Sequence, residues 1–121
     1  MDTSFSGQPL LQGEVVFDDD ASSFADATLY VYLLNPIEDD DAVIVQQLVR
    51  EGIAYDARVK NRLPFVFYGE VPDERSHYIV SALVDLDGDG KAGEGDYINM
   101  ENYPVLTRGQ PNQVSVRVRA V

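Results

Sequence analysis

Short apolar segments, separated by turn-forming or acidic clusters, recur along the whole of this 121-residue chain. Each is rich in valine, isoleucine, leucine, tyrosine and phenylalanine, the residue types that favour β-strands. None shows the sustained 3.6-residue apolar repeat, with capping residues, that is typical of an amphipathic helix. Six segments are therefore predicted to be strands: residues 10–17, 27–35, 42–49, 63–70, 77–86 and 113–121.

Alternation of apolar and polar side chains supports two of these predictions most clearly. In residues 113–121, valines alternate with serine and arginines, which predicts that the valines face the core and the arginines face water. In residues 27–35, leucine and valine alternate with threonine and tyrosine in the same way. Residues 42–49 are less regular, and their spacing alone also allows one or two helical turns, but their β-branched content favours a strand.

Several short strands without crossover helices predict an all-β fold with little or no helix. We expect an antiparallel β-sandwich of about six to eight strands with Greek-key connections. The chain length suits one hydrophobic core, because a second core would have too few residues to bury. The expected organisation is a flexible N-terminal segment over residues 1–9 and a single monomeric domain over residues 10–121.

Charge and composition limit the classes of partner. Because 21 acidic side chains outweigh 9 basic ones, the formal charge is −12, which repels nucleic acid and anionic lipid. The same charge favours cations and basic protein surfaces, although solubility alone also explains it. No cysteine is present, which excludes disulfides and thiolate metal sites, and no apolar run approaches the roughly 18 residues of a membrane span.

The N-terminal sequence MDTSFSGQPL lacks the basic start and the apolar stretch of a signal peptide. Two locations remain open at this point. The protein is either cytoplasmic, or a mature chain whose export signal is missing.

The segment DLDGDGKAGEGDY, over residues 85–97, has the spacing of a calcium loop. Counted from the first aspartate, carboxylates stand at positions 1, 3, 5 and 12, a glycine at position 6, and a carbonyl ligand is expected at position 7. Only oxygen ligands are offered, which suits calcium, with magnesium as the alternative. The predicted ligands are Asp85, Asp87, Asp89 and Asp96 through their carboxylates and Lys91 through its carbonyl.

A plain hairpin turn is the alternative interpretation of this segment, because Asp-Gly is a strong turn dipeptide. Four carboxylates at fixed offsets would repel one another in such a turn, however, and a divalent ion removes that repulsion. Over about a dozen residues the segment resembles the calcium loops of EF-hands and dockerin modules. The residues before it are strand-like, so the resemblance does not extend to the helices of an EF-hand.

The block YPVLTRG, residues 103–109, followed by a proline at 111 and alternating valines, resembles the C-terminal signature of the YbaY/YscW-type bacterial lipoprotein domain. The resemblance implies a small β-sandwich in the periplasm, usually tethered by a lipidated cysteine, and some members are pilot proteins for secretion components. This chain has no such cysteine, and an acidic loop replaces the usual short turn between two late strands. The block also has a structural explanation as a loop that aims the final strand.

Enzymatic activity is not expected. His77 is the only histidine, and no nucleophile motif accompanies it. The seven tyrosines could line a sugar- or peptide-binding face, although sheet packing is their usual role. The acidic runs 18–20 and 38–41 could hold a second ion or a basic partner, although solvated loops are the default.

Two function classes follow from the sequence. The first is a non-enzymatic, calcium-binding module of the bacterial cell envelope or periplasm that binds a protein partner or assists assembly. The second is a purely structural domain, or a dockerin-like attachment domain, in which the calcium loop itself forms the interaction surface.

Overall fold

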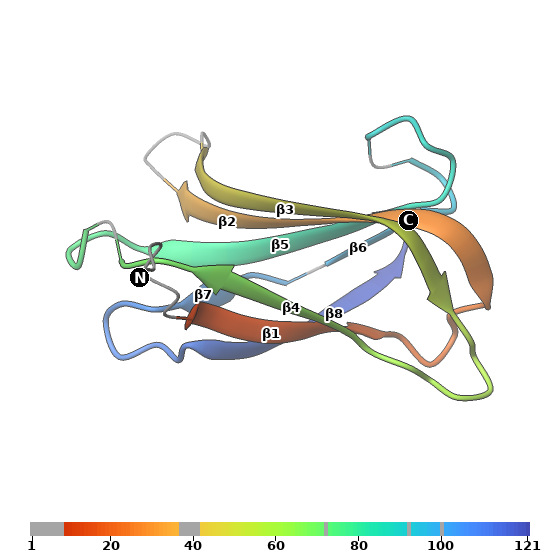
Figure 1. Cartoon of the computed structure of the whole chain (residues 1–121), viewed down its shortest axis with the longest axis horizontal. Coiled ribbons are helices and arrows are strands. Elements are labelled where there is room, and N and C mark those ends of the chain that lie inside the picture. The colour runs from red at the N-terminus through yellow and green to blue at the C-terminus, as the bar shows by residue number, and fades with distance from the viewer. Residues whose placement is uncertain (1–8, 37–41, 72, 92, 100) are drawn as a thin grey trace, which may run out of the picture.

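The computed structural model describes residues 9–36, 42–71, 73–91, 93–99 and 101–121. Within these residues every regular element is a β-strand and no helix is present (Figure 1). The all-β prediction is therefore confirmed. The strands are β1 (Pro9–Phe17), β2 (Phe24–Pro36), β3 (Ala42–Tyr55), β4 (Leu63–Tyr68), β5 (Tyr78–Asp85), β6 (Tyr97–Asn99), β7 (Tyr103–Val105) and β8 (Gln113–Ala120).

All eight strands belong to one curled sheet with the order β3-β2-β5-β6-β8-β1-β4, and β7 pairs with β5 beside this path. The sheet forms a nearly closed barrel (Figure 1). β1 and β8 are parallel, whereas the other pairs are antiparallel. The expected Greek-key sandwich describes this arrangement poorly, because β6 pairs with both β5 and β8 and so joins the strands into one layer.

The largest differences between the strand bounds and the sequence prediction concern β3, β6 and β7, while β2 begins three residues earlier and β4 ends two residues earlier than predicted. β3 continues to Tyr55, six residues beyond the predicted end, with Gly52 at φ +70° where the alternation breaks. β6 and β7 were not predicted, because three residues are too few to show a period of two. The predicted N-terminal segment lies outside the described residues except for Pro9, which begins β1.

The core lies on the inner face of the curled sheet. As the alternation predicted, Leu29, Val31 and Leu33 are fully buried, and so are Val116 and Val118, while the arginines of β8 are exposed. At one end of the barrel four aromatic rings pack with centroids 4.3–6.0 Å apart. They come from the strand ends: Phe17, Phe24, Tyr55 and Tyr97.

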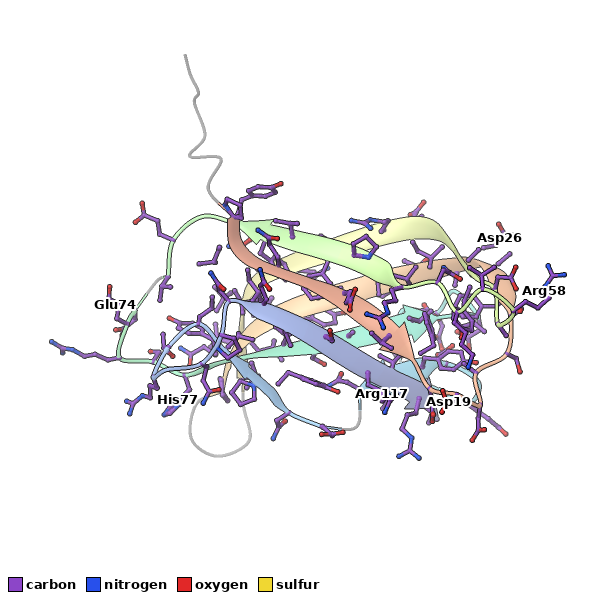
Figure 2. The ribbon with its side chains drawn as sticks, turned by 90° about the horizontal axis from the view of Figure 1, so that it is seen from below. Asp19, Asp26, Arg58, Glu74, His77 and Arg117 are labelled. Atoms are coloured by element: carbon purple, nitrogen blue, oxygen red, sulfur yellow. The ribbon has the colours of Figure 1, made fainter. Side chains whose placement is uncertain are left out.

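The turn between β4 and β5 lies at the opposite end of the barrel. Figure 2 shows Glu74 and His77 there, far from Asp26 and Arg58. His77 is exposed just before β5. Three of the seven tyrosines are buried in the core, so the tyrosines do not share one binding face.

The YPVLTRG block serves a structural role in this fold. Its first residues form β7, and the buried Thr107 donates from Oγ1 to the carbonyl oxygen of Ser76. The exposed Arg108 donates from Nη2 to the backbone carbonyl of Arg75, at 2.9 Å. The block therefore fastens the final turn to the turn before β5.

Candidate metal centre

The loop between β5 and β6 is held at its base by two buried aspartates. Asp85 is the last residue of β5, and Asp96 comes directly before β6. Because Val84 pairs with Tyr97 in the antiparallel ladder, the next two positions, 85 and 96, also lie side by side. Each of these two residues is only 1% exposed. Burial of two carboxylates demands compensation by hydrogen bonds or by a cation.

Four carboxylates converge in this loop. Asp85, Asp87, Asp89 and Asp96 each offer one oxygen, and these four oxygens all lie within 4.8 Å of one another. Asp87 and Asp89 are exposed on the loop, which follows β5 and rises above the sheet in the view of Figure 1. The structure thus brings together all four carboxylates that the sequence spacing predicted as ligands.

The loop folds back on its own aspartates through backbone amides. Asp85 accepts from Gly88 at 3.0 Å on Oδ1 and from Gly90 at 2.6 Å on Oδ2. Asp87 accepts from the amide of Asp89 at 3.3 Å, and Asp89 accepts from the amide of Lys91 at 2.9 Å. These short-range bonds orient successive carboxylates toward the same side of the loop.

Asp96 is fixed from several sides. Its Oδ1 accepts from the amide of Leu86 at 2.8 Å, and its Oδ2 accepts from the amide of Gly93 at 3.0 Å. Its own amide donates to the carbonyl of Gly93 at 2.9 Å, and its carbonyl accepts from the amide of Val121 at 2.8 Å. Asp96 therefore joins the acidic loop to the chain that follows β8.

Glycine at position 90 has the role that the sequence predicted. Its φ is +75°, a conformation that a residue with a side chain adopts only with strain. A Cβ at this position would meet nothing closer than the Tyr30 hydroxyl, at 3.9 Å. The requirement for glycine is thus conformational and not one of space.

The electrostatics of the loop favour a cation. Burial raises the pKa of Asp85, but the amides of Gly90 and Gly88 and the contact with Asp87 outweigh it, so the pKa is lowered overall. The pKa of Asp87 is raised, chiefly because its carboxyl shares a hydrogen bond with Asp85 and also because Asp89 repels its charge. A divalent ion among these oxygens would relieve this crowding of negative charge.

The donor set fits a hard cation. Aspartate oxygens suit calcium or magnesium, and neither histidine nor cysteine stands among the four converging residues. Lys91 is exposed beside Asp89, and its carbonyl remains a predicted ligand.

The other acidic runs do not form such a centre among the residues that the structure describes. Asp18 accepts a 3.2 Å bond from Nε of Arg119, and Asp19 lies 3.9 Å from Nζ of Lys60. Each of these two aspartates of run 18–20 thus has a basic side chain nearby. The run at residues 38–41 lies outside the described part of the chain.

Comparisons with known proteins bear on the fold. No protein-family model matches the chain, and no curated protein matches it. Membership of the family suggested by the YPVLTRG block therefore stays a prediction. The chain is similar to a solved structure described as an alternative pilotin from the type II secretion system of Vibrio cholerae. The two are 21% identical, the match covers 92% of this chain and 95% of the other, and the TM-score is 0.65, which shows a shared fold.

Proposed function

We propose that this protein is a non-enzymatic accessory module of the bacterial cell envelope that binds a protein partner during assembly. The observation that carries this proposal is the fold shared with a secretion-system pilotin over 92% of the chain. The YPVLTRG block supports it independently, because the domain that it resembles includes pilot proteins of the periplasm. A periplasmic or envelope location belongs to the same proposal.

The absence of an enzymatic role is also part of the proposal. His77 is exposed at the start of β5, and no hydrogen bond joins it to a nucleophile among the described residues. Such a module would bind its partner without catalysing a reaction.

In the same proposal the loop over residues 85–96 binds one calcium ion. Support comes from four carboxylate oxygens within 4.8 Å of one another, two of them on residues that are 1% exposed. Such an ion would have a structural role, because Asp85 is the last residue of β5 and Asp96 directly precedes β6, so that the ion would hold these two strand ends together. Extracellular calcium modules bind with dissociation constants of about 0.1–1 mM, and the short side chain at position 96 favours this weak range.

One observation favours the attachment-domain alternative. Asp87, Asp89 and Glu94 are exposed on the loop, which extends from the end of the sheet (Figure 1). In that case the calcium-bound loop would itself be the surface that a partner contacts. The two functions differ in where a partner binds and not in whether calcium binds.

The test combines calcium titration with partner capture. Amide chemical shifts of the labelled chain would be followed during calcium addition, and saturable shifts are expected in residues 85–97 and at Val121, whose amide donates to Asp96. The immobilised chain would then be exposed to envelope extract with calcium or with chelator. Competable capture of an outer-membrane assembly component, identified by mass spectrometry, supports the accessory role. Capture that needs calcium and is lost in Asp87→Asn and Asp89→Asn supports the attachment alternative, and no competable capture contradicts both.

A further inference from the structure

The two edge strands of the sheet, β3 and β4, face each other without forming a ladder. In the described part of the chain β3 pairs only with β2, and β4 pairs only with β1. Apart from isolated closer approaches, the Cα atoms of the two strands lie more than 8 Å apart. Neighbouring strands of a ladder lie about 4.8 Å apart, so β3 and β4 are too far apart to pair with each other directly, and an added strand would pair with each of them instead. We call this opening, between residues 46–50 and 64–68, the seam.

Two side chains of β3 reach across the seam to the backbone of β4. Gln46 donates from Nε2 to the carbonyl of Tyr68 at 3.0 Å, and Arg50 donates from Nη1 to the carbonyl of Pro64 at 2.9 Å. Going from Gln46 to Arg50 the residue number rises by four, while the partner changes from Tyr68 to Pro64 and so falls by four. The two strands are therefore aligned antiparallel across the gap. Side chains therefore occupy the place where backbone hydrogen bonds of an intervening strand would lie.

The backbone of β4 presents its even-numbered residues to the seam. The carbonyls of Pro64 and Tyr68 point there, because they accept from β3. Val66 pairs in register with Gln12, whose amide points away from β4 and donates to Asn112. Since backbone groups of such a non-bonded pair point away from each other, the N–H and C=O of Val66 also face the seam.

Pro64 fits this orientation. A proline in a strand is tolerated where its missing N–H is on the unpaired side. The N–H that position 64 lacks would point into the seam. Two amides of β4, those of Val66 and Tyr68, are thus left to donate to an added strand, while the alternate residues, Phe65 and Phe67, bond β1.

The two strands that border the seam carry exposed apolar side chains, and an acidic residue lies beyond each end of the seam. Val43, Ile44 and Val49 of β3 and Tyr68 of β4 are each about half exposed. Fourteen-residue β3 carries neither lysine nor proline, the residues that commonly protect an exposed sheet edge. Two exposed carboxylates flank this strip: Glu51 on β3 and Glu70 shortly after β4.

We propose that the seam binds an extended segment of a protein partner, which has apolar side chains at alternate positions and a lysine or arginine at each flank. The segment would add as a strand between β3 and β4, accept from the Val66 and Tyr68 amides, and displace the Gln46 and Arg50 side chains. The formal charge of −12 favours such a cationic partner. This inference rests on the proposed protein-binding function, since it names the surface and the chemistry of the partner.

Amide hydrogen exchange tests the proposal on the full chain. The probe is the capped peptide acetyl-Lys-Val-Thr-Val-Thr-Val-Lys-amide, added to the labelled protein. At saturation the amides of Val66 and Tyr68 should exchange about tenfold more slowly. The amides of Phe65 and Phe67, which face β1, should not change and serve as the internal control. The same peptide with prolines in place of the central valine and threonines should give no protection.

Charge variants test where the peptide lies. Glu51→Lys combined with Glu70→Lys should weaken binding about tenfold and reduce its dependence on salt, because both flanking attractions become repulsions. Asp20→Lys combined with Glu101→Lys makes the same change of net charge at two exposed positions that lie outside β3 and β4. This control pair should weaken binding by less than about threefold. Equal losses in the two pairs would contradict a site at the seam.

Other outcomes would overturn the proposal outright. The proposal is contradicted if saturating peptide does not slow amide exchange at Val66 and Tyr68. It is also contradicted if dimerisation protects these amides without peptide, because a second copy of the chain would then occupy the seam. The test is separate from that of the proposed function. If the peptide protects these amides but no envelope component is captured, the accessory role is contradicted and the binding site at the seam is supported. If capture persists in the Glu51 and Glu70 variants, the accessory role is supported and the binding site at the seam is contradicted.

Discussion

The carbonyl oxygen of Asp96 accepts a 2.8 Å hydrogen bond from the amide of Val121, so the last carboxylate of the acidic loop is joined to the residue that follows β8. Asp96 therefore links three parts of the fold: the loop, the start of β6 and the end of β8. An ion that fixes its side chain would also fix its backbone.

Calcium binding should slow hydrogen exchange at the Val121 amide. This amide donates to Asp96, and a cation that holds the Asp96 side chain would reduce the opening of that bond. The Gln110 amide, which donates to Thr107 in a separate turn, serves as the reference. Exchange measured by NMR with calcium and with chelator should differ at position 121 and not at position 110. Equal rates at position 121 would contradict a link between the loop and β8.

Asp85→Asn should remove the stabilisation that calcium provides. The variant keeps the shape of the side chain but loses a buried negative charge and one acceptor for the Gly90 amide. At a calcium concentration about 100 times the dissociation constant, the wild-type chain should gain about 2.7 kcal/mol of unfolding free energy. For a chain of this size the gain corresponds to about 10 °C in Tm.

The measurement for this prediction is the difference between thermal melts in calcium and in chelator. It cancels the direct cost of the substitution, since both melts use the same variant. Asp20→Asn, at an exposed position in the acidic run after β1, should keep the full wild-type difference. Wild-type melts that coincide in calcium and chelator would show that the loop is a turn without an ion.

Gly90→Ala should cost about 1 kcal/mol of stability in chelator. The substitution places a side chain at φ +75°, where the left-handed conformation is strained. Gly93→Ala is the matched control, because Gly93 lies in the same loop and does not have a positive φ. Urea unfolding should show a change below about 0.5 kcal/mol for the control. A larger cost at position 93 would contradict the conformational explanation.

Gly13→Ala should destabilise the sheet by about 2–3 kcal/mol. A Cβ at position 13 would lie 2.6 Å from the carbonyl oxygen of Val114 and 2.5 Å from Cζ of Phe65. The carbonyl cannot retreat without disturbing the parallel pairing of β1 with β8. Gln12→Ala, at the exposed neighbouring position, is the control and should have little effect in the same urea unfolding experiment.

Asp18→Asn should reduce the loss of stability at acid pH. Partial burial raises the pKa of Asp18, but the hydrogen bond from Arg119 and the nearby positive charges lower it below the usual value of 3.8. A carboxyl with a lowered pKa stabilises the fold above its unfolded pKa, and this contribution is lost as pH falls through the folded pKa. Unfolding free energies at about pH 6 and about pH 3, in chelator, should therefore differ less in the variant than in the wild-type chain. An unchanged difference would show that the Asp18–Arg119 pair contributes nothing.

The sequence predicted local features of the fold well. Alternation in residues 27–35 and 113–121 identified strands with the correct buried faces, because a period of two is encoded within each strand. The curled single sheet was not predictable in this way, since it depends on the parallel pairing of β1 with β8, about 100 residues apart. The three-residue strands β6 and β7 are likewise defined by their partners and not by their own sequences.

In the candidate metal centre, too, the local features were predictable from the sequence, whereas the features that depend on distant strands were not. The spacing of residues 85–96 predicted which carboxylates would converge, because a tight loop with positive-φ glycines fixes their relative directions. The burial of Asp85 and Asp96 could not be predicted, since it results from the pairing of β5 with β6 and of β6 with β8. Nor could the hydrogen-bond partner of Arg108 be predicted, because the backbone carbonyl of Arg75 is brought to it by the fold.

The parallel pairing of β1 with β8 has a consequence for how the polypeptide reaches its final form. The strand nearest the beginning of the chain finds one of its two neighbours only in residues 113–120. During synthesis, the emerging portion therefore lacks the strand that lies between β1 and β6 until residues 113–120 have been made. Until then the sheet is incomplete, and its unpaired strand edges are exposed to other proteins.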